Sequence, residues 1–256
     1  MAVNIQALAR QMLADYDARK PGLCTSEPLH ITIAESYEVQ SAIAFQRELR
    51  GETIIGYKVG CTSRQIQAQL GVNEPIFGRL FAQESHPSGS SLSAAAFANL
   101  AVEGELAVRL GRNLSGPCIT LEDCHEAIKA TFAVIELHHY VLPPAWPRPQ
   151  WLIASGGLHA GFIESKADTP DNPMAQSITL RVNHNVVGTV NDETGLVSPS
   201  RSLLWLASRL RDFGLQLKAG QLILTGSPLP LFPVGPGDRI LVEAHPLKAC
   251  HVKIAP

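Results

Sequence analysis

Three glutamates stand in segments that otherwise resemble β-strands. Glu103 and Glu105 lie in the alternating segment 101–110, and side chains two residues apart in a strand point to the same face. Glu136 lies in the apolar run 132–137, where an isolated carboxylate is costly to bury unless it is paired or coordinated. Three carboxylates without a thiolate cluster suit a hard cation, Mg²⁺ or Mn²⁺. The alternative is that Glu103 and Glu105 face water on a half-exposed strand.

The composition is that of an ordinary soluble enzyme. The 256 residues are 45% hydrophobic and 17% charged, with a net charge of -2. This balance, without a basic stripe, gives no electrostatic reason to expect nucleic-acid binding. Because the sequence has no apolar run of about eighteen residues and no signal peptide at its start, we expect no membrane span. The five cysteines form no Cys-x-x-Cys pair, which favours reduced thiols in the cytoplasm.

The periodicity predicts helices first and strands later. Apolar residues with helical spacing indicate a helix from residue 5 to 13, and Thr32 with Glu35 forms a capping box that opens a second one. Thr120 is expected to cap another helix, and a later one over 203–210 ends at Gly214. Strands are expected at 178–182, 186–190, 222–224, 240–242 and 251–254, with a hairpin turn at 183–185. We also expect a turn at 20–23 and a stiff proline-rich loop at 143–149 that borders the functional site. Together, these elements indicate an α+β fold.

Lys58 stands inside a short apolar strand pattern, Ile55-Gly56-Tyr57-Lys58-Val59-Gly60. The stretch from Gly56 to Ser63, with the motifs that follow it, resembles the 2-keto-4-pentenoate hydratase/4-oxalocrotonate decarboxylase family of the fumarylacetoacetate hydrolase-like superfamily. The further matches, in order, are Gln69-Leu70-Gly71-Val72, Pro75-Ile76-Phe77-Gly78, Val102-Glu103-Gly104-Glu105, Leu110 to Leu114, Glu136, Ala160-Gly161-Phe162, Leu224 to Ser227 and Pro236-Gly237-Asp238.

The resemblance implies a helical N-terminal part beside a β-rich mixed-sheet roll. We expect a mainly helical region at 1–75 and a β-rich catalytic region at 76–256, acting as one unit. The resemblance also implies that the protein assembles into homo-oligomers, or forms a complex with a homologous hydratase or decarboxylase.

The same resemblance suggests how the site works. A 2-keto acid can chelate a divalent ion through its carboxylate and keto oxygen, and the ion stabilises the enolate. Glu103, Glu105 and Glu136 would hold the ion, while Lys58 would pair with a glutamate, orient the substrate or move a proton. Lys58 could instead be a surface lysine at a strand end. Thr225 and Ser227, at the end of an apolar strand, could receive the substrate carboxylate or simply form a tight turn.

Several polar groups of the family are replaced in this chain. Ala82-Gln83 stands where an aspartate is usual, His139-Tyr140-Val141 stands where Asp-Ser-Arg is frequent, and residues 154–159 replace an Asp-Asn segment. Histidine has an ordinary pKa of about 6.5, so His139 or His159 could transfer protons in their place. His138 shares the strand face of Glu136, whereas His139 points away from it unless a bulge intervenes. Either histidine could instead be a hydrogen-bonded structural residue.

These features predict a metal-dependent lyase that hydrates a 2-hydroxy-2,4-dienoate to a 4-hydroxy-2-keto acid. Decarboxylation of a 4-oxalocrotonate-like acid is the alternative within the same chemistry. A third hypothesis is a non-catalytic structural partner of an active homologue, motivated by the replaced polar groups.

Overall fold

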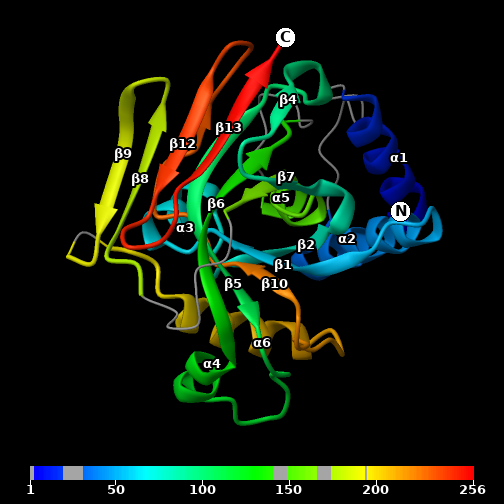
Figure 1. The fold of residues 1–256 in the computed structure, drawn as a ribbon. Helices are drawn as coiled ribbons and strands as arrows, with labels where there is room; N and C mark the ends of the chain where they lie inside the picture. Colours follow the sequence, from blue (N-terminus) through cyan, green and yellow to red (C-terminus); the bar gives the residue numbers. More distant parts are fainter. Residues whose placement is uncertain (1–2, 20–30, 141–148, 166–173, 194) are drawn as a thin grey trace.

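The computed structural model describes residues 3–19, 31–140, 149–165, 174–193 and 195–256. Figure 1 shows a sheet at one side of the molecule, two long helices at the other, and a strongly curved sheet between them. The two N-terminal helices precede two mixed, mostly antiparallel sheets, which confirms the α+β class. The described chain contains no helix that is both long and apolar enough to cross a membrane.

The two N-terminal helices are α1 (Ile5–Ala18) and α2 (Ile33–Leu49), and they pack against each other. Thr32 caps α2 through the backbone N–H of Glu35, whose side chain accepts a hydrogen bond from the N–H of Thr32. The predicted capping box is therefore confirmed. The expected turn at 20–23 lies outside the described residues.

The larger sheet runs in the order β2-β1-β10-β5-β6-β7-β3, with the short β11 paired to β5. Its strands are β1 (Ile54–Gly60), β2 (Ile76–Phe81), β3 (Ser85–Pro87), β5 (Ala101–Leu110), β6 (Ile128–His138), β7 (His159–Glu164), β10 (Leu222–Leu224) and β11 (Phe232–Pro233). The β1–β10 and β3–β7 pairs are parallel and the others antiparallel. This mixed, curled sheet is the expected roll, and it surrounds the functional residues.

The smaller sheet runs in the order β4-β13-β12-β8-β9 and is seen at the left of Figure 1. Its strands are β4 (Ser91–Ser93), β8 (Ser177–Val182), β9 (Asn185–Asn191), β12 (Arg239–Glu243) and β13 (Cys250–Ala255). The β8–β9 hairpin turns where the sequence predicts. One apolar core joins this sheet to β5 and β6, and another packs the helices against β1, β2 and β5.

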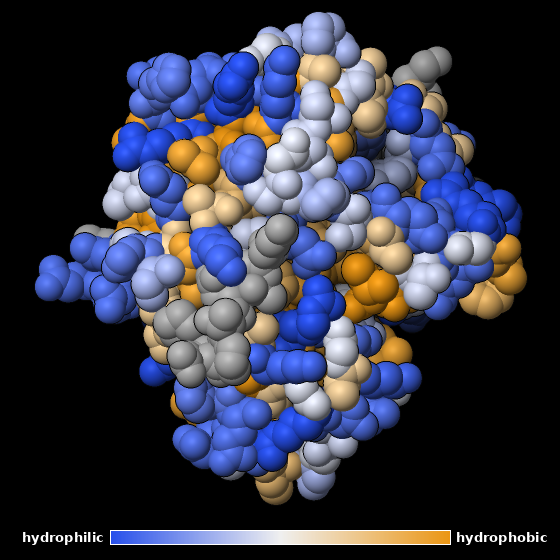
Figure 2. Space-filling view, in the orientation of Figure 1, coloured by the Kyte–Doolittle hydropathy of each residue, from blue (hydrophilic) through white to orange (hydrophobic). Residues whose placement is uncertain are grey.

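The remaining helices of the described chain lie in the connections between strands. They are α3 (Arg64–Leu70), α4 (Leu121–Ala127), α5 (Pro149–Ala154), α6 (Pro199–Arg211), and the single turns η1 (Ala82–Glu84) and η2 (Ala94–Ala96). Thr120 caps α4 as predicted. On the face shown in Figure 2, hydrophilic side chains surround smaller apolar areas.

The expected division of the chain at residue 75 stays a prediction. β1 precedes that position but pairs with β2 and β10 in the large sheet. The helical region is therefore tied to the β-rich region through the strand that carries Lys58.

Gly56 lets β1 approach β10 closely, and this pairing places Lys58. A Cβ at Gly56 would lie 1.8 Å from the carbonyl oxygen of Leu222, so alanine cannot fit unless the strands separate. We expect Gly56→Ala to lower the free energy of unfolding by about 3 kcal/mol, the cost of a strained, overpacked site, as measured by urea denaturation. Gly235→Ala is the control, because a Cβ there meets no atom within 4 Å. Equal stability of the two variants would contradict this account of the β1–β10 contact.

Candidate metal centre

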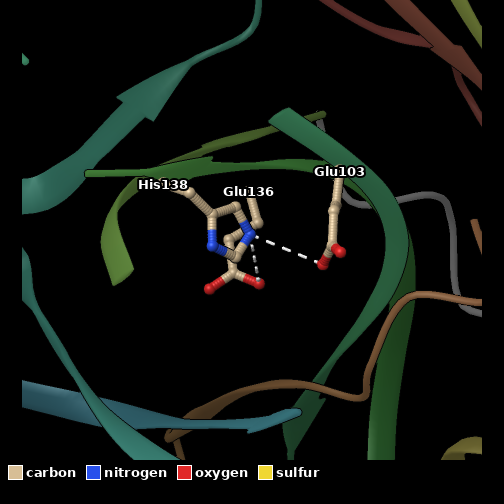
Figure 3. Close-up of side chains that lie close together, drawn as sticks. All are labelled: Glu103, Glu136 and His138. Atoms are coloured by element: carbon tan, nitrogen blue, oxygen red, sulfur yellow. Dashed lines mark ion pairs between the residues drawn. The ribbon is translucent and has the colours of Figure 1, made fainter. Parts of the chain in front are cut away.

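Two glutamates face each other across neighbouring strands. Glu103 on β5 is the direct register partner of Glu136 on β6, and Figure 3 shows both carboxylates turned toward the same space as the His138 ring. Like charges directly opposite in a sheet destabilise it. Glu136 is only 2% exposed, so this pair requires positive charge nearby.

Lys58 supplies one such charge. Its side chain is buried, with Nζ 2.9 Å from Glu136 Oε1, and it donates to the carbonyl oxygen of Gly157 at 3.3 Å. Burial by itself would lower the pKa of Lys58, but Glu136 and Glu103 outweigh it and raise that pKa. The lysine is therefore a fixed cation inside the roll, which excludes the alternative of a surface lysine.

The backbone at Gly157 is shaped around this lysine. Gly157 has a φ of +75°, and a Cβ there would lie 2.8 Å from both Cε and Nζ of Lys58. Only glycine adopts this positive φ at low cost and also leaves room for the Lys58 side chain.

Glu105 is fully buried and only half satisfied. Its Oε2 accepts the backbone N–H of Gly226 at 2.6 Å, whereas Oε1 has no hydrogen-bond partner within the described part of the chain. Burial and the nearby Glu136 raise the pKa of Glu105 well above its ordinary value. This unpartnered buried oxygen fits a site for a cation, whereas the water-facing alternative does not hold for Glu105.

Thr225 and Ser227 stabilise the turn that contains Gly226, whose backbone N–H binds Glu105. The Thr225 hydroxyl donates to the carbonyl oxygen of Leu106, and the Ser227 hydroxyl contacts the carbonyl oxygens of Gly104 and Leu229. Both hydroxyls are thus engaged with the backbone. Their contact with a substrate carboxylate stays a prediction, and the tight-turn alternative describes the contacts present.

His138 joins the glutamates, as expected from the face it shares with Glu136. Its Nε2 lies 3.4 Å from Glu103 Oε2 and 3.5 Å from Glu136 Oε2, and these three residues offer ligand atoms within 4.8 Å of one another. Burial would lower the pKa of His138, but Glu136 and Glu103 raise it to about 9. His138 was not predicted as a ligand, and its spacing of two residues from Glu136 was the available signal.

His159 reaches the same centre through a β-bulge. Leu137 pairs with Gly161, but His138 pairs with His159 rather than Ala160, and this shift turns His159 toward Glu136. Its Nδ1 lies 2.7 Å from Glu136 Oε1. Together, Lys58, His138 and His159 hold the pKa of Glu136 well below its usual range, although burial opposes them.

His139 lies apart from this cluster. Its Nδ1 accepts the N–H of Ala98 at 3.1 Å, and its Nε2 lies 3.2 Å from the carbonyl oxygen of Tyr16. Burial lowers the pKa of His139, so the neutral ring donates from Nε2 to Tyr16. A role in proton transfer stays a prediction, and both ring nitrogens are occupied by the backbone. The loop at 143–149, expected to border the site, lies mostly outside the described residues.

Oxygen and imidazole donors in this arrangement fit a hard or intermediate divalent cation. Glu103, Glu136 and His138 converge, and Glu105 adds a carboxylate oxygen that no described residue hydrogen-bonds. Magnesium and manganese both accept such ligands. The residues present therefore fit the ion that the sequence predicts.

Comparison with known proteins gives consistent relatives. The chain is 29% identical to 2-hydroxyhexa-2,4-dienoate hydratase of Comamonas testosteroni, covering 92% of this chain and 91% of the relative. It is 31% identical to 2-oxo-hept-4-ene-1,7-dioate hydratase of Escherichia coli, with 83% of each covered. A solved structure of 4-oxalocrotonate decarboxylase from Pseudomonas putida G7, complexed with magnesium and adipate, superposes with a TM-score of 0.92 at 26% identity, covering 99% of both chains.

The family model described as fumarylacetoacetate (FAA) hydrolase C-terminal matches residues 57–255, which contain every strand of the large sheet except the first residues of β1. The chain therefore belongs to the fumarylacetoacetate hydrolase family.

Proposed function

We propose that this protein is a divalent-metal-dependent lyase that hydrates a small 2-hydroxy-2,4-dienoate to a 4-hydroxy-2-keto acid. The observation that carries the proposal is the convergence of Glu103, Glu105 and Glu136 near the buried Lys58, with Glu105 Oε1 lacking a hydrogen-bond partner among the described residues. The hydratases among its relatives, named for 2-hydroxydienoic and 2-keto acids, support the substrate class.

The charge of the centre supports a divalent ion. Three carboxylates against Lys58 leave two negative charges in excess when His138 is neutral. Without a metal, protons compensate: the pKa of His138 is raised to about 9 and that of Glu105 is raised as well. An ion of charge two can replace these two protons, which a monovalent ion cannot do.

The ion and the residues around it have different roles in the reaction. A bound Mg²⁺ or Mn²⁺ would supply a Lewis acid for the negative charge that develops on the keto oxygen. Lys58 Nζ fixes Glu136 and keeps positive charge at the centre. His159 contacts Glu136 through Nδ1, so its imidazole lies at the centre and can move a proton there during ketonisation and addition of water.

Decarboxylation is the second candidate. The chain is 28% identical over 239 residues to 4-oxalocrotonate decarboxylase of Pseudomonas sp. strain CF600.

Incubation of the protein with Mg²⁺ and either 2-hydroxypenta-2,4-dienoate or 4-oxalocrotonate distinguishes hydration from decarboxylation. Loss of dienol absorbance with a 4-hydroxy-2-keto product marks a hydratase, whereas released CO₂ marks a decarboxylase. Failure of both reactions would favour the non-catalytic partner.

We also propose a cytoplasmic, self-associating protein. The described cysteines Cys61, Cys118, Cys124 and Cys250 are free thiols, as expected in a reducing compartment. Phe45 and Leu49, one helical turn apart on α2, are 59% and 72% exposed, and such apolar side chains suit a contact with a second copy or a homologous subunit.

Removal of the ion or of its carboxylates should abolish turnover. We expect activity to disappear in chelator and to return with Mg²⁺ or Mn²⁺. Glu105→Gln and Glu136→Gln should be inactive with an unchanged circular dichroism spectrum, because each removes a charged ligand but keeps the side-chain shape. Glu122→Gln, on an exposed position of α4, is the control. Undiminished turnover by metal-free Glu105→Gln would contradict the proposal.

Binding of Mg²⁺ should release protons and strengthen as pH rises. In the metal-free protein the raised pKa of His138, about 9, stabilises the folded state; this contribution is complete below the unfolded pKa of about 6.5 and is lost as pH passes 9. A cation opposes protonation of His138 and Glu105, so both release protons. Calorimetry at pH 7.5 in two buffers of different ionisation enthalpy should detect at least one proton released per ion, and fewer in His138→Gln. A pH-independent affinity would contradict the charge argument.

His159→Ala should lower kcat at least tenfold, about 1.4 kcal/mol of barrier. Affinity for Mg²⁺ should change little, because His159 contacts Glu136 but is not itself among the converging ligand groups. Stopped-flow turnover and calorimetry measure the two quantities. Wild-type turnover in the variant would contradict the catalytic role and show that His159 only packs in the core.

A further inference from the structure

Glu84 lies on the far side of His159 from the metal centre. It ends the single turn η1, and its side chain is buried. Its Oε2 is 3.9 Å from Nε2 of His159, and neither atom has a hydrogen-bond partner within the described residues. The imidazole thus stands between two carboxylates, with Nδ1 on Glu136 and Nε2 facing Glu84.

The other oxygen of Glu84 is firmly held by the N-terminal helices. Glu84 Oε1 accepts the hydroxyl of Tyr16 from α1 at 2.7 Å and Nη2 of Arg47 from α2 at 2.6 Å. Arg47 is also ion-paired with Glu52, and its guanidinium lies 3.6 Å from the centre of the Phe81 ring. Two anchors hold Oε1 in place, and Oε2 lies on the side of the histidine.

A buried carboxylate oxygen facing an unpartnered ring nitrogen is costly unless the two interact. A separation of 3.9 Å exceeds a hydrogen bond, and a direct bond requires a proton on Nε2 or on Oε2, because a ring nitrogen and a carboxylate oxygen without a proton are both acceptors. Carboxylates that orient a histidine from behind are a general means of fixing which ring nitrogen faces the reacting groups.

We propose that Glu84 is a positioning residue that holds His159 in its orientation against Glu136, and that α1 and α2 contribute to the reaction through it. The proposal rests on the proposed lyase function of the centre. It also gives a role to a carboxylate beside Ala82-Gln83, where the sequence lacks the usual aspartate.

A double-mutant cycle tests whether Glu84 acts through His159. We expect Glu84→Gln to lower kcat about tenfold with KM and Mg²⁺ affinity little changed. In the His159→Ala background the same substitution should have almost no further effect. Glu52→Gln is the matched control, because Glu52 also pairs with Arg47 but makes no ion pair or hydrogen bond with His159, both of which the structure describes. This variant should leave kcat unchanged. An equal loss of kcat in both backgrounds would overturn the proposal.

A measurement without turnover separates this inference from the proposed function. In metal-free protein, Glu84→Gln should shift the ¹⁵N resonance of His159 Nε2, assigned by its absence in His159→Ala, and Glu52→Gln should not. If Glu84→Gln fails to fold, Tyr16→Phe removes one anchor from Glu84 and should give a smaller shift of the same resonance. An unchanged resonance in these variants would refute the positioning role, whereas a shifted resonance in a protein without lyase activity would refute only the function.

Discussion

Buried negative charge is the constraint on which the centre of this molecule depends. Glu105 and Glu136 are almost completely removed from water, and Glu103 stands directly opposite Glu136. Coulomb repulsion between such groups is large because the surroundings are poorly polarisable. The fold offsets this repulsion with Lys58, the Gly226 amide and two histidines, yet one oxygen of Glu105 has no hydrogen-bond partner in the part of the chain that the structure describes. A site with this excess of negative charge can bind a cation.

The curled sheet makes this arrangement possible. β1 brings Lys58, β5 and β6 bring the glutamates, and β7 brings His159 from a fourth strand. Two glycines with positive φ permit close approaches at the centre. Gly157 lies beside Lys58, and Gly226, whose amide binds Glu105, is where a Cβ would lie 2.4 Å from Thr62. The helices α1 and α2 then reach the centre from outside through Arg47, Tyr16 and Glu84.

Local patterns in the sequence predict much of this structure. The period of a strand puts Glu103 and Glu105 on one face and His138 on the face of Glu136, and capping residues mark the starts of α2 and α4. The position of His159 was not predictable in this way, because a bulge between β6 and β7 decides which face it occupies. Glu84 gave no signal at all: a short 3₁₀ turn and anchors distant in the sequence place its carboxylate. Features set by local periodicity are thus visible in the sequence, whereas those set by register and long-range contacts require the structure.

The central claim is that one divalent ion binds among these carboxylates, and anomalous diffraction from crystals containing Mn²⁺ tests it most directly. The account predicts a single strong anomalous peak inside the roll, at coordination distance, about 2.0–2.2 Å, from oxygens of Glu103, Glu105 and Glu136, that disappears in Glu105→Gln crystals. A peak elsewhere on the protein, with no ion beside Glu103, Glu105 and Glu136, would contradict it.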